Sequence, residues 1–156
     1  MKWSKWLEKW DMTSLKIKTP FLEMDWNPSE PDKVAAWQLY VELLTRITTQ
    51  ALPVSDGDEK TALDSVYSLF PTTRSIIREN GCGCIEFTKI AVVVLNQKIR
   101  PFTAKWHRKS LSGGFNDPSV AQQFRRELEG LQSTLRRYTA MLSDMAGVED
   151  LTDLEG

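Results

Sequence analysis

The chain has 156 residues, 41% of them hydrophobic and 26% charged, and its formal net charge is −1. A chain of this length is expected to form one domain that buries a hydrophobic core without the help of metals or disulfides. The near-neutral charge excludes a strongly cationic or anionic protein, so any electrostatic binding must depend on a local patch.

The first 31 residues are predicted to form a tryptophan-rich segment followed by an arm. Within residues 1–11, apolar side chains recur at the i, i+3, i+4, i+7 spacing of one helical face, at Trp3, Trp6, Leu7 and Trp10. A helix of roughly ten residues is marginally stable alone, so it needs a surface to lie on. Three surfaces fit: the core of this chain's own bundle, a groove in a partner protein, or a membrane interface. Residues 13–31 are expected to be an extended arm that packs apolar side chains on the bundle.

Two helices are predicted between residues 32 and 80. The first begins at Asp32 as its N-cap and ends at Pro53. Its expected core face is Val34, Trp37, Val41, Leu44, Ile47 and Ala51. The second follows a cap at Asp56 or Asp58, is kinked or split at Pro71, and stops at Asn80-Gly81. Its expected core face is Leu63, Val66, Phe70 and Ile77.

The third helix is predicted from Cys84 to Leu111, with a kink at Pro101. Its expected core face is Ile85, Val92, Leu95, Ile99, Phe102 and Trp106. Because the run IAVVVL is apolar all round, we expect this helix to be the most buried, although its β-branched residues make a central strand the competing interpretation.

The fourth helix has the most regular pattern. It is predicted to begin with Asp117 as N-cap and Pro118 as first residue, and to end at Gly147. Its near-heptad seam is Val120, Phe124, Leu128, Leu131, Leu135, Tyr138, Leu142 and Met145.

Short loops between long helices make neighbouring helices antiparallel. The sequence therefore predicts an all-α fold, an antiparallel bundle of about four long helices over residues 32–148. The amphipathic segment and arm of residues 1–31 should pack on this bundle, and residues 149–156 should form an acidic tail. The chain has no apolar run of about 18 residues and no signal-peptide pattern, so we expect a cytoplasmic protein.

The sequence offers little catalytic chemistry. It lacks a phosphate-binding loop, an HExxH zinc motif and a GxSxG nucleophile motif, and His107 is its only histidine. Cys82 and Cys84 are too close in sequence for a comfortable disulfide, and with one histidine they cannot complete a four-ligand zinc site. We therefore expect no enzyme activity, no cofactor and no metal site.

A basic pole is predicted at one end of the bundle, where the third helix ends and the antiparallel fourth begins. Its residues are Lys98, Arg100, Lys105, His107, Arg108, Lys109, Arg125 and Arg126. Such a pole would suit phosphates, nucleic acid or an acidic protein surface. A solvated helix face is the simpler interpretation of the same residues.

Four segments carry a resemblance to known proteins: ELLTRITTQAL, DSVYSLFPTTRSIIRENG, LNQKIRPFTAKWH and MAGVEDLTDLE. Together they are similar to small helical proteins of bacterial multi-gene conflict operons, which include anti-phage defence systems. The resemblance implies a bacterial cytosolic protein that acts beside other gene products, and it brings no catalytic residues with it.

We hypothesise a non-catalytic adaptor or regulatory subunit that binds another protein of its operon or complex. The expected contact residues are Trp3, Trp6, Leu7 and Trp10. One alternative is a nucleic-acid or nucleotide sensor that uses the basic pole, and another is a peripheral membrane protein anchored by the N-terminal helix. Self-association is also open.

Overall fold

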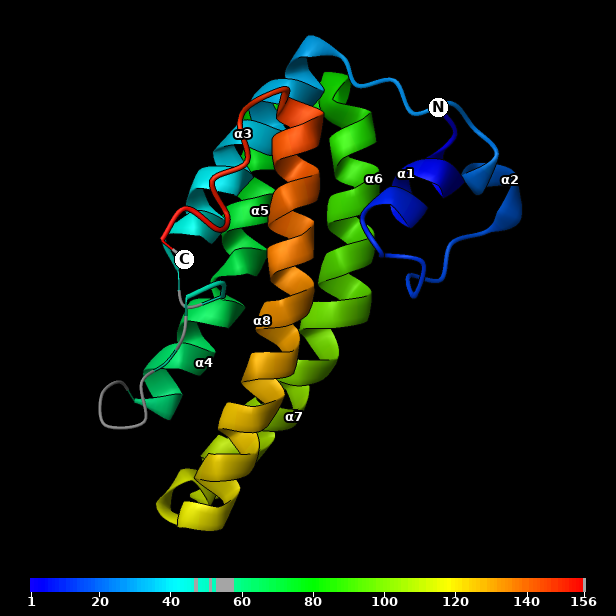
Figure 1. The fold of residues 1–156 in the computed structure, drawn as a ribbon. Helices are drawn as coiled ribbons and strands as arrows, with labels where there is room; N and C mark the ends of the chain where they lie inside the picture. The colour runs from blue at the N-terminus through cyan, green and yellow to red at the C-terminus, as the bar shows by residue number, and fades with distance from the viewer. Residues whose placement is uncertain (47, 51, 53–57, 156) are drawn as a thin grey trace.

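A computed structural model describes residues 1–46, 48–50, 52 and 58–155 (Figure 1). The chain is all-α, and the described residues contain no β-structure beyond an isolated antiparallel bridge between Lys2 and Asp25. The α-helices are α1 (Trp3–Lys9), α2 (Thr19–Leu22), α3 (Glu30–Leu44), α4 (Glu59–Tyr67), α5 (Leu69–Asn80), α6 (Ile85–Val94), α7 (Arg100–Leu111) and α8 (Pro118–Ala146). Two 3₁₀ turns, Gly81–Cys84 and Gly114–Asn116, and a π turn, Leu95–Ile99, connect some of them.

Four rods make the predicted antiparallel bundle: α3, α4 with α5, α6 with α7, and α8 (Figure 1). Successive rods run in opposite directions, and α8 spans the length of the bundle beside α3 and the α6–α7 rod. The unit made of α1 and α2 lies against the side of the bundle next to α6 (Figure 1). The core is continuous from this unit into the bundle.

The arm after α1 is less extended than predicted. Pro20 lies in the first turn of α2, a position where its missing N–H costs no helical hydrogen bond. The arm then turns back, so that Trp3 N–H donates to the Met24 carbonyl at 3.0 Å and Trp26 N–H donates to the Met1 carbonyl at 2.7 Å. The arm therefore closes over α1 and holds the N-terminus in place.

The predicted core face of α3 is wrong. The side chains that it buries are Ala35, Ala36, Leu39, Tyr40 and Leu43. Val34 and Trp37 are each 46% exposed, and Val41 is 40% exposed. The helix carries apolar residues on two sides, so spacing alone does not tell which side faces inward, and the small side chains of Ala35 and Ala36 suit close packing of helices.

The start of α3 is also shifted. Ser29, rather than Asp32, is the N-cap, and the two form a reciprocal capping box. Asp32 is 1% exposed, and its second carboxylate oxygen accepts a hydrogen bond from the Phe87 backbone N–H at 2.9 Å. Asp32 therefore ties the start of α3 to the start of α6. The predicted core positions Ile47 and Ala51 and the predicted break at Pro53 lie outside the described residues.

The second predicted helix is split as expected, but at Ser68, so that Pro71 falls in the first turn of α5. Asp58 is the N-cap of α4, as predicted, and the alternative cap Asp56 lies outside the described residues. Gly81 ends α5 with φ +72°, a left-handed value that glycine adopts without strain.

The π turn moves the buried face of the third predicted helix. The buried residues before it are Phe87, Ile90, Ala91 and Val94. The buried residues after it are Ile99, Phe102, Thr103 and Trp106. From Val94 to Ile99 the step is five residues, and the wider π turn keeps both on the core side. The prediction is therefore confirmed beyond the turn and wrong before it: Ile85 is 51% exposed and Val92 is 42% exposed.

The fourth predicted helix is confirmed. Asp117 caps α8, Pro118 is its first residue, and Gly147 ends it in the left-handed conformation. Every residue of the predicted seam is buried except Val120, which is partly buried against the core. After Gly147 the chain turns back along α3 (Figure 1), where the Tyr40 hydroxyl accepts from the Leu151 N–H at 2.7 Å and donates to the Glu149 carbonyl at 3.2 Å.

Candidate functional site

The tryptophan-rich face of α1 points into the molecule. Trp3 and Trp6 are 0% exposed and Leu7 is 2% exposed, whereas Trp10 is partly buried. The Trp6 ring stacks on Trp26 at a centroid distance of 4.8 Å and meets the edge of Trp3 at 5.3 Å. The segment thus caps this chain's own core. Binding of a partner or a membrane through these side chains stays a prediction, and it would require α1 to leave the bundle.

Two carboxylates of the bundle accept the indole N–H groups of this segment. Trp3 donates to Glu86 of α6 at 2.9 Å. Trp6 and Trp10 both donate to one oxygen of Asp144 in α8, at 2.8 and 3.1 Å. Buried indole N–H groups need such partners, because an unpaired one loses its hydrogen bonds to water without replacement. The α1 face is therefore fixed by both apolar contact and hydrogen bonds.

The residues of the predicted basic pole are spread along the π turn, the whole of α7 and the first third of α8, and two of them are paired with glutamates. Lys105 pairs with Glu127 at 2.7 Å, and Arg125 pairs with Glu59 of α4 at 3.1 Å. The pKa of Glu127 lies below its ordinary value. Partial burial raises this pKa, but the hydrogen bond and positive charge of Lys105, together with a hydrogen bond from Gln123, lower it by more.

The other members of the pole have different surroundings. Lys98 donates to the Ser14 hydroxyl at 3.0 Å, and the Lys109 ammonium lies 5.2 Å from the centre of the Trp106 ring. Arg108 and Arg126 are exposed, and neither has an ion pair within the described part of the chain.

The remaining two members of the pole, Arg100 and His107, face α4 and α5. Arg100 covers the Phe70 ring, and His107 meets the Tyr67 ring. The eight residues of the predicted pole therefore do not form one continuous positively charged surface.

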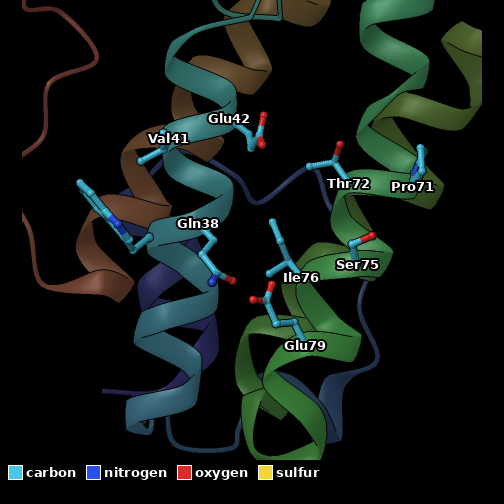
Figure 2. A pocket seen from close by; sticks show the side chains of 9 residues that line it. Gln38, Val41, Glu42, Pro71, Thr72, Ser75, Ile76 and Glu79 are labelled. Carbon is cyan, nitrogen blue, oxygen red and sulfur yellow. The ribbon is translucent and has the colours of Figure 1, made fainter.

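A groove with both apolar and polar lining residues lies between α3 and α5 (Figure 2). It encloses about 560 Å³ and is open to solvent along its length. Its lining residues are Trp37, Gln38, Val41, Glu42, Pro71, Thr72, Ser75, Ile76 and Glu79. Ile76, which is 6% exposed, lies between the two helices (Figure 2), and the lining residues Trp37 and Val41 are exposed by 46% and 40%. Val34, one turn before Trp37 in α3, is also 46% exposed and extends this apolar side of the helix.

The two carboxylates of the groove lie toward its two ends, and the polar side chains of Gln38 and Ser75 lie beside Ile76 in the middle (Figure 2). Glu42 lies toward one end and Glu79 toward the other, with Ile76 between them (Figure 2). Arg46 pairs with Glu42 at 2.7 Å and also donates to Thr72 at 3.2 Å, which joins the two helices. Glu79 has no ion-pair partner among the residues described. Among the described residues, the groove thus combines apolar and uncharged polar side chains with one carboxylate, that of Glu79, which has no ion-pair partner.

The spacing of apolar residues places Trp37 and Val41 in the core, so the α3–α5 groove could not be predicted from it. A signal was present: α3 has apolar residues on two opposite sides, and only one side can face α8. Glu79 carried no signal in the sequence, because its neighbours Gln38 and Val41 come from a different helix.

Within the described part of the chain, no three His, Cys, Asp or Glu side chains are grouped so that they could hold a metal ion. No helix there is long and apolar enough to cross a membrane. Comparison of the chain with protein-family models, curated protein sequences and solved structures finds no match.

Proposed function

We propose that this protein is a non-catalytic interaction module, an adaptor or regulatory subunit of a bacterial complex, and that its partner docks on the α3–α5 groove. The observation that carries the proposal is the exposed apolar stripe Val34, Trp37 and Val41 beside that groove. A half-exposed tryptophan flanked by two exposed valines leaves apolar area in water that a partner would cover. Tryptophan is also the residue type most enriched among those that dominate binding energy at interfaces.

The partner segment that fits is an amphipathic helix with a basic residue on its apolar edge. The groove runs between two helices, and such grooves receive the apolar face of a third helix. Charge complementarity supports the basic residue, because Glu79 lies at one end of the groove without an ion-pair partner among the described residues. The resemblance to proteins of conflict operons supports a partner encoded nearby, in a defence complex.

The test starts from tagged wild-type protein recovered from its native host with its bound partner, followed by reconstitution of the purified pair. Val41→Arg places a charge in the middle of the docking surface and should weaken binding at least about tenfold, which corresponds to about 1.4 kcal/mol. Val92→Arg is the matched control, since Val92 of α6 has nearly the same exposure (42% against 40%) but lies outside the groove. Both variants should melt within about 2 °C of wild type, as surface changes usually do.

Glu79→Lys should also weaken the complex, and a Lys→Glu or Arg→Glu change in the partner helix should restore it. Equal binding by wild type, Val41→Arg and Val92→Arg would contradict the assignment of the groove. Failure of the wild-type protein to retain any partner at its natural expression level would contradict the adaptor proposal itself.

A further inference from the structure

Two arginine side chains from different helices lie against the same buried ring. The guanidinium carbon of Arg74 in α5 is 5.7 Å from the centre of the Phe70 ring, and that of Arg100 in α7 is 4.7 Å from it. Arg100 also donates to the Asn96 side chain at 3.3 Å. Neither guanidinium has a carboxylate partner in the described ranges of the chain. Two positive charges from different helices therefore border one aromatic ring, and neither has a carboxylate partner among the described residues.

An exposed aromatic ring continues this surface. Tyr67 is 47% exposed, and its ring centre lies 5.6 Å from that of Phe70 and 4.9 Å from that of His107. An oxygen of Asp64 lies 4.0 Å from the His107 ring nitrogen, and the Asp64 carboxylate is paired with Lys60 at 2.6 Å. We call Tyr67, Arg74, Arg100 and His107 the arginine–aromatic patch.

We propose that the arginine–aromatic patch binds a nucleotide unit, with the phosphate between Arg74 and Arg100 and the base against the exposed Tyr67 ring. A guanidinium group offers a planar fork of donors that matches phosphate oxygens. Neighbouring like charges repel each other, and a bound phosphate relieves that repulsion. Bases stack on aromatic side chains whatever their identity, so Tyr67 predicts binding with little base preference.

This site differs from the predicted basic pole. It shares Arg100 and His107 with the pole but depends on Arg74, which belongs to another helix, and the pole's Lys105 and Arg125 are paired with glutamates. It also lies apart from the α3–α5 groove, because none of its four residues lines that groove. The phosphate and base could come from a free nucleotide or from a single-stranded nucleic acid, which present the same chemistry to the patch.

The test is a titration of the full-length protein with inorganic phosphate, AMP, ATP and a labelled single-stranded DNA or RNA oligonucleotide. We expect binding of at least one base-containing ligand that weakens severalfold between about 50 and about 200 mM salt. Arg74→Ala and Arg100→Ala should each weaken it about tenfold and reduce its salt dependence. Tyr67→Ala should weaken base-containing ligands and leave inorganic phosphate unchanged.

Arg78→Ala is the matched control, because Arg78 is an exposed arginine of the same helix as Arg74 without a ring contact. It should leave every affinity within about twofold. Tight binding of the oligonucleotide with weak binding of AMP and ATP identifies a nucleic-acid strand as the ligand, and the reverse identifies a free nucleotide. No binding at low salt, or an equal loss in Arg78→Ala and Arg74→Ala, overturns the proposal; a normal melting curve for each variant shows that the loss is not unfolding.

Discussion

Replacing Trp6 by alanine tests whether the tryptophan face of α1 belongs to the core. Trp6 is 0% exposed, stacks on Trp26, and donates from its indole nitrogen to Asp144 at 2.8 Å. Truncation of a fully buried aromatic side chain to alanine costs about 3–5 kcal/mol through lost burial and the cavity left behind. A domain of this kind is typically stable by only about 5–15 kcal/mol, so Trp6→Ala should remove a large share of the total.

Trp6→Phe separates the two contributions. Phenylalanine keeps an aromatic ring in the site but cannot donate, and Asp144 still accepts from Trp10 and Lys9. The loss should therefore be about 2–4 kcal/mol, because a hydrogen bond to a charged group contributes about 1.5–3 kcal/mol and the smaller ring adds a loss of burial.

Urea denaturation followed by circular dichroism measures these losses, with Trp37→Ala as the matched control. Trp37 is 46% exposed, so its truncation gives up only about half of the burial that Trp6 loses and should cost clearly less, about 1–2 kcal/mol. If Trp6→Ala costs no more than Trp37→Ala, α1 is not packed on the bundle in solution. Its tryptophan face would then be available to a partner or a membrane, as the sequence also allowed.

Three further predictions concern stability. Asp32→Ala should lower the free energy of unfolding by about 2–3 kcal/mol in urea, because it leaves the buried Phe87 N–H without an acceptor; a loss under about 0.5 kcal/mol would contradict that role. Leu135→Ala should cost about 2–5 kcal/mol and Arg137→Ala, at a partly buried side chain, under about 1 kcal/mol, and the opposite order would mean that the register of α8 is wrong. Hydrogen bonds from the hydroxyl and N–H of Ser119 hold the pKa of Asp117 below its ordinary value. The contribution of this cap to the stability of the fold is therefore fully present above the unfolded pKa of about 3.9, and it is lost as the pH falls through the lower pKa of the folded state. Thermal unfolding of Asp117→Asn between pH 2 and pH 6 should therefore change less with pH than that of wild type, and parallel curves would contradict this.

The sequence predicts an element correctly where several local signals agree. In α8, the cap at Asp117, the proline after it, the seam and the terminal Gly147 all indicate the same helix, and all are confirmed. The stop at Gly81 follows from a glycine with φ +72°. Local chemistry determines these features, so neighbours in the sequence carry the information.

The sequence was insufficient where a face had to be chosen between two apolar sides. Trp37 and Ala36 are adjacent in α3, and hydrophobicity favours the tryptophan for the core, yet Ala36 is buried and Trp37 is half exposed. The choice depends on how closely α8 approaches, which is a property of another helix. The π turn Leu95–Ile99 is a comparable case. One extra residue in the turn changes which side of α6 faces the core, and the apolar spacing does not show it.

A wrong core face also affects the functional hypothesis, because exposed residues that are assigned to the core are not considered as a binding surface. When Trp37 and Val41 are taken for core, the tryptophan face of α1 is the most conspicuous apolar pattern left for a partner, and the hypothesis that follows places the interface there. Once Ala36 and Leu39 are known to fill the core, the same helix presents its other apolar side to solvent, while α1 is needed inside. The choice between interfaces thus reduces to which tryptophan lies in water, Trp37 or Trp6. The two alanine substitutions above measure that difference in one experiment.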